Sequence, residues 1–271
     1  MTKTALAVVS GGLDSTTMVY DLLNQDYEVQ CISFNYGQRH RKELVFASAN
    51  ARMLNLDHDI VDITSITKFI SNSALTSDGS WRPTETASTP VIEVPEGHYA
   101  EENMKATVVP NRNMIMLSIA AGIAVNRGLG TIATAVHAGD HFIYPDCRPE
   151  FIAEVAEAIA AGNEGFAKFE KTENGGVLPL TTPYLYKTKA EIAFRALNLN
   201  VPLHLTWSCY VGGSNHCGRC GTCVERLEAI DEALRRYNSL VATSVGQKMD
   251  ATAYDDTEFW KVAIEKAKSD A

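Results

Sequence analysis

The sequence predicts an α/β protein in which helices cover both faces of a doubly wound, mostly parallel β-sheet. Short apolar runs alternate along the chain with stretches of helical periodicity, as expected for parallel strands joined by crossover helices. The first apolar run stops at the turn Ser10-Gly11-Gly12, and a helix-like stretch follows at once. With 271 residues and an ordinary globular composition, the chain is long enough to bury a sizeable core.

Short apolar runs predict the strands, and each is followed by a helix-like stretch or a turn. In chain order, these runs are ALAVV (5–9), VQCISFNY (29–36), HDIVDI (58–63) and TIATAV (131–136).

Helical periodicity predicts the elements between and after the strands. The stretch 113–126 is apolar and rich in alanine, which indicates a buried helix, and Pro149 suits the first turn of another. In chain order, the predicted helices are 14–25, 39–54, 113–126, about 149–161, 187–197 and 224–237.

The segment 71–108 differs from the rest because it is rich in Gly, Pro, Ser and Thr and lacks periodicity. A long irregular segment in a compact domain is usually functional, so we expect a lid or an interface loop. The predicted organisation is an α/β domain over 1–207, a cysteine-rich knot and helix over 208–238, and a C-terminal helical tail over 239–271 with one amphipathic stretch, FWKVAIEKAK. The tail has no assigned role.

The charge and hydropathy of the chain limit its partners. The formal net charge of −9 argues against a broad nucleic-acid-binding surface. No stretch approaches the roughly 18 apolar residues of a membrane span. The N-terminus is a poor signal peptide because the turn glycines interrupt a short apolar run. We therefore expect a cytoplasmic protein that binds neither nucleic acid nor membrane.

The turn after the first strand has the physics of a phosphate-binding loop. Gly11 and Gly12 let backbone amides approach an anion, the hydroxyls of Ser10 and Ser15 add donors, and the next helix points its positive end at the same place. A carboxylate at Asp14 suits a site where Mg²⁺ accompanies a polyphosphate. The alternative is a plain strand-to-helix turn with Asp14 or Ser15 as a cap.

The run SGGLDS resembles the signature of the N-type ATP pyrophosphatases. That resemblance implies that the loop binds the pyrophosphate end of ATP and that an acid or amide oxygen is adenylated. The residues it assigns to ATP are Val9, Ser10, Gly11, Gly12, Leu13, Asp14, Ser15, Thr16, Thr17, Met18 and Val19.

Four of the six cysteines fall within fifteen residues, and they are Cys209, Cys217, Cys220 and Cys223. The Cys-x-x-Cys-x-x-Cys core with one more cysteine upstream fits a single tetrahedral Zn²⁺. Four thiolates leave no open coordination position, so one structural zinc per chain is expected. An iron–sulfur cluster or four unligated cysteines are the alternatives.

Taken together, the loop and the cysteine cluster resemble the 7-cyano-7-deazaguanine synthase family over residues 4 to about 236. The motifs that carry the resemblance are SGGLDSTT (10–17), FNYGQRHRKE (34–43), VVPNRNMIMLSIAA (108–121), HAGDHFIYPDCRPEF (137–151) and PLTTPYLYKTKAEI (179–192), in this order and with the cysteines. It implies an adenine nucleotide alpha hydrolase-like fold. It also implies that ATP and ammonia convert 7-carboxy-7-deazaguanine to the nitrile through an adenylated acid and an adenylated amide.

The middle motifs supply further candidates at the carboxyl edge of the sheet. Arg39 and Arg112 are candidates for holding phosphate or the substrate carboxylate, and with Ser10 and Asp14 they form the predicted catalytic set. The predicted substrate-binding residues are Tyr36, Gln38, Arg39, Asn113, Asp140, Tyr144 and Asp146.

Each of these candidates has a simpler alternative. Arg39 and Arg112 fit surface or capping positions, and Asp146 fits a helix cap. Lys187 and Lys189 suit phosphate or a helix surface equally well. Cys147 is a candidate nucleophile, but a buried structural thiol is the favoured prediction. Cys31, inside a predicted strand, is expected in the hydrophobic core.

The chain departs from the usual family pattern at Asn111, where glycine is common, and near Ala138 and Phe142, and it extends past the usual family end at about 237. These departures affect the prediction of which substrate is bound more than the prediction of ATP-dependent adenylation. Related functions that share the loop are a deazaguanine enzyme stopping at the amide and a tRNA-modifying ATP pyrophosphatase, whereas a non-catalytic zinc module has no use for SGGLDST. We expect a homodimer.

Overall fold

The structure is a computed structural model that describes residues 3–70, 72–76, 92–164, 179–240 and 251–269. Its centre is a sheet of five parallel strands in the order β3-β2-β1-β4-β5. The strands are β1 (Lys3–Val8), β2 (Tyr27–Asn35), β3 (His58–Asp62), β4 (Thr131–Ala133) and β5 (Leu180–Thr181). The order reverses between β1 and β4, so these two strands flank the topological switch point of the sheet.

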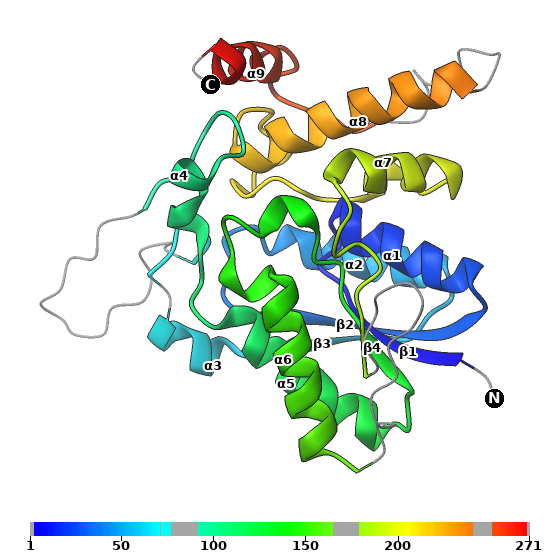
Figure 1. The fold of residues 1–271 in the computed structure, drawn as a ribbon. Helices are drawn as coiled ribbons and strands as arrows, with labels where there is room; N and C mark the ends of the chain where they lie inside the picture. The colour runs from blue at the N-terminus through cyan, green and yellow to red at the C-terminus, as the bar shows by residue number, and fades with distance from the viewer. Residues whose placement is uncertain (1–2, 71, 77–91, 165–178, 241–250, 270–271) are drawn as a thin grey trace, which may run out of the picture.

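Helices cover both faces of this sheet (Figure 1). One face packs against α1 (Leu13–Asn24) and α2 (Lys42–Met53), with α7 (Lys189–Asn198) packed on α1 and α8 (Gly221–Leu240) on α7. The other packs against α5 (Arg112–Asn126) and α6 (Pro149–Gly162). The remaining helices are α3 (Thr64–Thr67), α4 (Glu101–Met104), α9 (Phe259–Ser269) and the single-turn 3₁₀ helices η1 (Lys68–Ile70), η2 (Lys105–Thr107), η3 (Ala138–Asp140), η4 (Pro145–Cys147) and η5 (Leu203–Leu205).

The alternation of side chains along the strands explains why both faces are covered. In β1, Ala5 and Ala7 face the core beneath α1 and α7, whereas Leu6 between them faces the core beneath α5. The same alternation places Cys31 and Ile32 of β2 on opposite faces. Because both sets of side chains are apolar, neither face can be left in water, and the doubly wound α/β fold predicted from the sequence is confirmed.

The predicted elements are present, with differences at their ends. The strand predicted over 131–136 ends at Ala133, and residues 134–136 continue past the edge of the sheet into a cavity wall. The helix predicted from 39 begins at Lys42, and the one predicted from 224 begins at Gly221. The two-residue strand β5 was not predicted because it is too short to show any periodicity.

The predicted lid or interface segment falls partly outside the described residues. Of its described part, residues near Pro95 lie along the cysteine-rich loop, where Glu96 pairs with Cys220 in an antiparallel bridge and Arg219 binds the Glu96 carboxylate. The predicted amphipathic stretch of the tail forms α9, which contacts α8 (Figure 1).

Arg226 ties α8, the segment before the cysteines and the described tail together. Its side chain is fully buried, and its guanidinium donates to Thr206 Oγ1 at 2.7 Å, the Leu203 carbonyl at 2.8 Å and the Tyr254 hydroxyl at 2.9 Å. It also donates to Ser208 Oγ and Thr252 Oγ1. A buried guanidinium is tolerated only when its donors are satisfied, so the three segments must be in place together.

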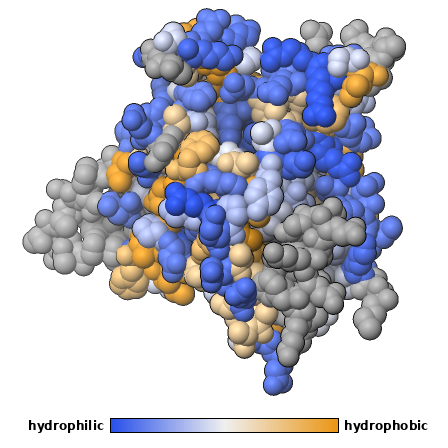
Figure 2. All heavy atoms as spheres, in the orientation of Figure 1, coloured by the Kyte–Doolittle hydropathy of each residue, from blue (hydrophilic) through white to orange (hydrophobic). Residues whose placement is uncertain are grey.

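Hydrophilic side chains cover most of the face shown in Figure 2, with apolar patches between them. Within the described residues, no helix is both long enough and apolar enough to cross a bilayer.

Replacing Arg226 with Met should lower the free energy of unfolding by about 3 kcal/mol, because several buried acceptors lose their donor at once. The matched control is Arg235→Met on the exposed side of the same helix, which should change the free energy of unfolding by less than about 0.5 kcal/mol. Urea unfolding followed by circular dichroism measures both, and equal effects would contradict the proposed role of Arg226.

Candidate active site

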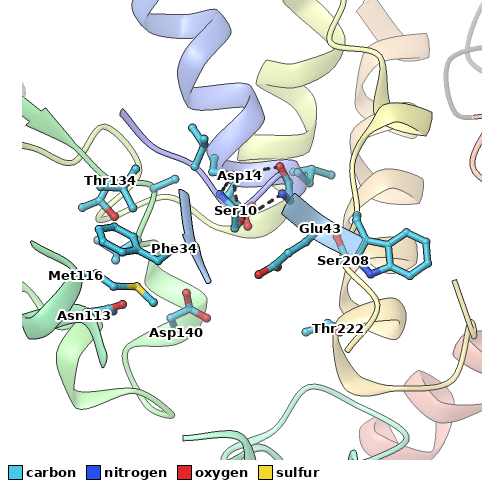
Figure 3. Close-up of a pocket in the computed structure, with 18 of the residues that line it drawn as sticks. Ser10, Asp14, Phe34, Glu43, Asn113, Met116, Thr134, Asp140, Ser208 and Thr222 are labelled. Atoms are coloured by element: carbon cyan, nitrogen blue, oxygen red, sulfur yellow. Dashed lines mark hydrogen bonds between the residues drawn. The ribbon is translucent and has the colours of Figure 1, made fainter. Parts of the chain in front are cut away.

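A cavity of about 230 Å³ opens at the carboxyl edge of the sheet, at the switch point between β1 and β4. Its walls come from the loop before α1, the ends of β2 and β4, and parts of α2, α5, α7 and α8. Figure 3 shows side chains from these elements converging on one space, with Ser10 and Asp14 on one side and Asn113 and Met116 on another. Open α/β sheets bind their ligands at this position.

The glycine-rich loop forms one end of the cavity. Gly11 has φ +79, and a Cβ on it would collide with the backbone of α2 at Glu43 and Ala47, so glycine is required there. The loop hydroxyls satisfy one another: Ser10 Oγ and Ser15 Oγ are 3.1 Å apart, and the Gly12 N–H donates to Ser10 Oγ. These groups can transfer their hydrogen bonds to phosphate oxygens, and the start of α1 adds its positive end.

The predicted nucleotide-binding stretch 9–19 divides into two parts. Val9, Ser10, Gly12, Leu13, Asp14 and Ser15 line the cavity. Thr16, Thr17, Met18 and Val19 do not, since Thr17 Oγ1 donates to the Leu13 carbonyl and Met18 and Val19 pack in the core. Gly11 contributes through the turn that it permits and not through the cavity surface.

Asp14 takes part in a buried group of charges. Its Oδ2 is 2.6 Å from Lys189 Nζ, and Lys189 is 3.5 Å from Glu225 Oε2. Burial raises the pKa of Asp14, but the charge of Lys189, its hydrogen bond to the carboxylate and the nearby His137 outweigh this and hold the pKa below its usual range. Burial lowers the pKa of Lys189, and Asp14 and Glu225 more than reverse this, so the lysine stays charged. By contrast, Lys187 is exposed and pairs with Glu191, so the structure distinguishes the two lysines.

His137 links the end of β4 to this group. Its Nδ1 accepts from the Gly139 N–H at 3.1 Å, which places the proton of the neutral ring on Nε2. Nε2 lies 3.5 Å from Asp140 Oδ2 and 4.0 Å from Asp14 Oδ2. Asp140 also accepts from the Tyr99 hydroxyl at 3.0 Å. As a result Asp140 is held at the cavity wall, where its carboxylate points into the cavity (Figure 3).

Arg112, the first residue of α5, brings a positive charge to the cavity. Its guanidinium lies 5.8 Å from the ring of Tyr36 and 5.7 Å from that of Tyr144. Burial opposes its charge, but Tyr36 and Asp146 outweigh this and raise the pKa, so the guanidinium remains charged. Tyr36 lines the cavity, whereas Tyr144 lies behind it, with its hydroxyl 2.6 Å from Thr107 Oγ1.

Three predicted binding residues serve other parts of the structure. Gln38 is buried, and its side chain contacts the Tyr36 N–H, the Phe34 carbonyl and Glu43. The Arg39 guanidinium donates to the Ile92 carbonyl and does not line the cavity. Asp146 accepts from the Asn113 N–H at the first turn of α5, so it caps this helix and not the one that follows it. Asn113 itself lines the cavity.

The family departures lie around the cavity and not on its surface. Asn111 has φ +59, a left-handed conformation that glycine and asparagine tolerate best, so asparagine is a conservative change there. Neither Ala138 nor Phe142 lines the cavity.

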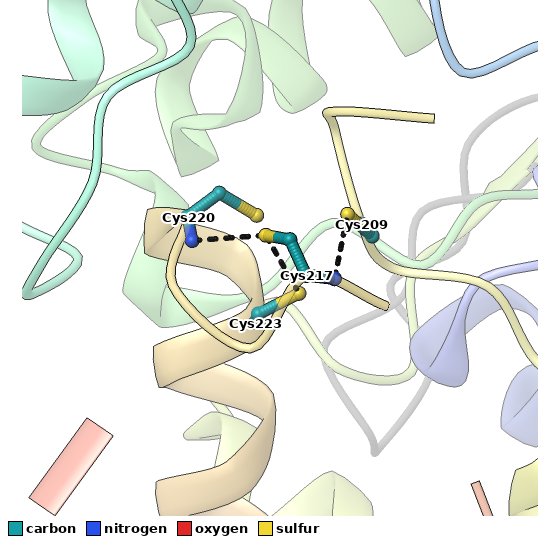
Figure 4. A group of neighbouring side chains, drawn as sticks. All are labelled: Cys209, Cys217, Cys220 and Cys223. Atoms are coloured by element: carbon teal, nitrogen blue, oxygen red, sulfur yellow. Dashed lines mark hydrogen bonds between the residues drawn. The ribbon is translucent and has the colours of Figure 1, made fainter. Parts of the chain in front are cut away.

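The four clustered cysteines face one another (Figure 4), and their sulfurs all lie within 4.8 Å of one another. Cys217 Sγ and Cys223 Sγ are 3.9 Å apart. The N–H groups of Arg219 and Cys220 point at Cys217 Sγ, and that of Cys217 points at Cys209 Sγ. Because none of the four is in a disulfide, this group can hold a metal ion.

The two isolated cysteines are buried thiols. Burial raises the pKa of Cys31, which lies in β2, to about 12. Cys147 lines the cavity, but burial together with Asp140 and Asp146 raises its pKa well above the usual range, and Asn113 donates to its sulfur. A thiolate nucleophile is therefore disfavoured.

Sequence reasoning missed several residues of the cavity. They are His40, Glu43, Trp207, Ser208, Tyr210 and Thr222, and Lys189, for which phosphate binding and a helix surface were both expected, also lines the cavity. His40 and Glu43 belong to the motif FNYGQRHRKE (34–43). The other four lie beside or between the clustered cysteines. Their closeness in sequence to the cysteines was the one feature from which these four could have been predicted.

Comparison with known proteins gives consistent matches over nearly the whole chain. The family described as "Queuosine biosynthesis protein QueC" matches residues 4–234. A 7-cyano-7-deazaguanine synthase from Brucella anthropi is 45% identical over 261 residues, covering 96% of this chain and 97% of its own length. One from Ruegeria pomeroyi is 44% identical over 260 residues, covering 96% and 98%.

The match with these relatives extends beyond residue 237, because 96% of this chain is aligned. The family model ends at residue 234, near the expected family end at about 237, whereas these relatives also align with part of the tail beyond it. Among solved structures, an NH3-dependent NAD synthetase from Campylobacter jejuni aligns with 99% of this chain and 85% of its own, at 14% identity and a TM-score of 0.42.

Replacing Lys189 with Met should destabilise the fold, because Asp14 then stays buried without its cation. In the wild type the folded-state pKa of Asp14 is lowered, so its contribution is present near neutral pH and is lost on acidification through that pKa. The variant should raise this pKa. Its deficit in the free energy of unfolding, about 3 kcal/mol at pH 7, should therefore shrink as the pH falls toward 4. Urea unfolding at several pH values measures it, with Lys187→Met as control, and a deficit independent of pH would contradict this account.

Proposed function

The chain belongs to the queuosine biosynthesis protein QueC family, and from this premise we propose that it is an ATP-dependent ligase making 7-cyano-7-deazaguanine. The substrates are 7-carboxy-7-deazaguanine, ammonia and ATP. The observation that carries this proposal is the composition of the cavity. A phosphate-binding loop forms one end, and a charged guanidinium and a carboxylate face the same space from other walls.

The reaction proceeds by activating one oxygen at a time. The substrate carboxylate oxygen attacks the α-phosphorus of ATP, the α–β bond breaks, and pyrophosphate leaves. Ammonia then displaces AMP from the acyl-adenylate to give the amide. A second ATP adenylates the amide oxygen, and loss of AMP and of the nitrogen's protons gives the nitrile. Adenylation is needed twice because both oxygens are poor leaving groups.

The residues of the cavity suit these steps. The Gly12 N–H and the hydroxyls of Ser10 and Ser15 hold the departing pyrophosphate. Arg112 binds the substrate carboxylate through its positive charge and orients the carboxylate oxygen that attacks the α-phosphorus. Asp140 accepts N–H groups of the deazaguanine ring, since a carboxylate is an acceptor that matches such donors. Lys189 keeps Asp14 ionised at the mouth of the loop.

Asp14 is the residue that fits a Mg²⁺ ion brought by ATP. Its Oδ1 is buried and has no hydrogen-bond partner in the described part of the chain, as suits a carboxylate oxygen awaiting a hard cation. When bound, the ion neutralises polyphosphate charge.

A structural Zn²⁺ fits the four cysteines, because their sulfurs lie within 4.8 Å of one another and the Cys217–Cys223 pair, at 3.9 Å, is close to the roughly 3.8 Å expected between thiolates around one zinc. It would be held by Cys209, Cys217, Cys220 and Cys223, and its role is to fix the loop that carries Ser208 and Thr222 into the cavity. We propose that residues 208–238 form this zinc-organised subregion beside the α/β domain of 1–207, with 239–271 as the tail. A homodimer in the cytoplasm completes the proposal.

The reaction is tested by incubating the protein with ATP, Mg²⁺, ammonium and the acid carrying oxygen-18 in its carboxylate. Mass spectrometry should find the nitrile, with the label in AMP, and the free amide when ATP is limiting. Asp14→Asn should reduce turnover by about 100-fold or more while the fold persists. Label in inorganic phosphate with ADP as product would contradict the mechanism, and the amide as end product would favour the enzyme that stops there.

The metal is tested by elemental analysis of freshly purified protein, which should find one zinc per chain. Cys220→Ser should lose the metal, whereas Cys31→Ala, in the core of β2, should keep it. Chelation should speed hydrogen exchange over 209–223 before the sheet responds, because the sheet has its own apolar core. Iron in place of zinc, or full metal content in Cys220→Ser, would overturn the assignment.

A further inference from the structure

Two buried polar side chains of the cavity, His40 and Glu43, have no role in the steps above. His40 lies just before α2 and Glu43 lies in its first turn, and both line the cavity. His40 is 2% exposed and Glu43 is 8% exposed. Burying a carboxylate costs free energy unless its charge is compensated, so the partners of Glu43 are informative.

Glu43 has no permanently charged partner in the described ranges. Its Oε1 accepts from Gln38 Nε2 at 2.9 Å, and its Oε2 lies 3.4 Å from His40 Nε2. Gln38 is neutral, and the imidazole need not be charged. The carboxylate therefore retains attraction for a small cation that enters the cavity.

His40 has an unused acceptor. Its Nε2 faces Glu43, which favours the ring proton on that nitrogen and leaves a lone pair on Nδ1. Nδ1 is buried and has no hydrogen-bond partner among the described residues. A buried lone pair without a donor is costly, and a donor supplied by a ligand would satisfy it.

The pair lies beside the reacting end of the cavity. The first turn of α2 packs so closely on Gly11 that only glycine fits there, which brings Glu43 next to the phosphate-binding loop. In Figure 3 the carboxylate of Glu43 points toward the space that Asp140 faces from the opposite wall. The ring of Tyr210 lies 4.9 Å from that of His40 and lines the same cavity, so one aromatic ring is available to a cation there, whereas the ring of Trp207 already has Lys42 Nζ at 4.2 Å.

We propose that Glu43 and His40 form the binding site for the nitrogen nucleophile, taken up as the ammonium ion. This inference rests on the proposed function. Ammonium has N–H donors for the Glu43 carboxylate and for His40 Nδ1, and a positive charge for the carboxylate and the ring of Tyr210. A metal ion is a poorer occupant, because within the described ranges the cysteines are the group of three or more ligands placed to hold one.

The site also supplies the proton transfers that amide formation requires. Ammonium gives one proton to His40 Nδ1, and the lone pair this frees on nitrogen attacks the carbonyl carbon of the acyl-adenylate. A C–N bond forms, the C–O bond to AMP breaks, and AMP leaves with the electron pair. The nitrogen then gives a second proton to Glu43, which leaves the neutral amide, and both residues return their protons to water.

The test compares Glu43→Gln and His40→Gln with Glu232→Gln, an exposed control on α8. The wild type should show ATP–pyrophosphate exchange that depends on the acid and needs no ammonium. In both site variants this exchange should persist, while the ammonium concentration for half-maximal amide formation rises about tenfold or more, as expected for loss of one charge-assisted hydrogen bond. Hydroxylamine, which is neutral near pH 7, should still give the hydroxamate with both variants.

The outcomes separate this inference from the function on which it rests. If the wild type shows no exchange, the proposed function fails. If the wild type exchanges but the variants keep the wild-type ammonium dependence, or lose hydroxamate formation in parallel with amide formation, the ammonium site is wrong. Thermal unfolding checks the fold of each variant. If Glu43→Gln does not fold, His40→Gln decides the question, and if neither folds, the two residues are structural and the inference is overturned.

Discussion

The buried contact between Asp14 and Lys189 is the constraint on which the site depends. Asp14 lies in the first turn of α1, Lys189 begins α7, and Glu225, the second acidic partner of the lysine, comes from α8. Three charges out of water are tolerated only while they stay close together, so the packing of α7 on α1 and of α8 on α7 determines where the carboxylate beside the phosphate-binding loop lies. The geometry of the loop is thus set by helices encoded more than 170 residues later.

The cysteine-rich region is part of the same construction. The loop that carries the cysteines also supplies Ser208 and Tyr210 to the cavity, and Thr222 follows from the start of α8. Its conformation is fixed from two sides, by the sulfur cluster and by the hydrogen bonds of Arg226 to the segment before the cysteines and to Tyr254. A region with almost no apolar core of its own thereby forms one wall of a site whose other walls belong to the sheet.

Much of the fold followed from periodicity, and the differences have simple causes. Strand β4 is shorter than its apolar run because its neighbour β5 offers only Leu180 and Thr181 for pairing. The Thr134 N–H still donates to the Thr181 carbonyl, and beyond it Ala135 and Val136 become cavity wall. The residue types in a segment indicate whether the segment can form a strand, but the number of residues that pair in the sheet depends on the neighbouring strand. Likewise, the capping role of Asp146 became visible only when α5 placed the Asn113 N–H beside it.

The sequence by itself determined the features that reside in one continuous segment. The glycine-rich loop and the four cysteines are such features, because their chemistry follows from spacing over a few residues. Tertiary structure decided which isolated polar residues face the cavity. Arg112 does and Arg39 does not, Lys189 is buried against Asp14 while Lys187 is exposed, and Glu43 faces the cavity while its neighbour in the motif, Gln38, supports the wall. The direction of a side chain depends on how its helix docks on segments distant in sequence, and no local pattern encodes that packing.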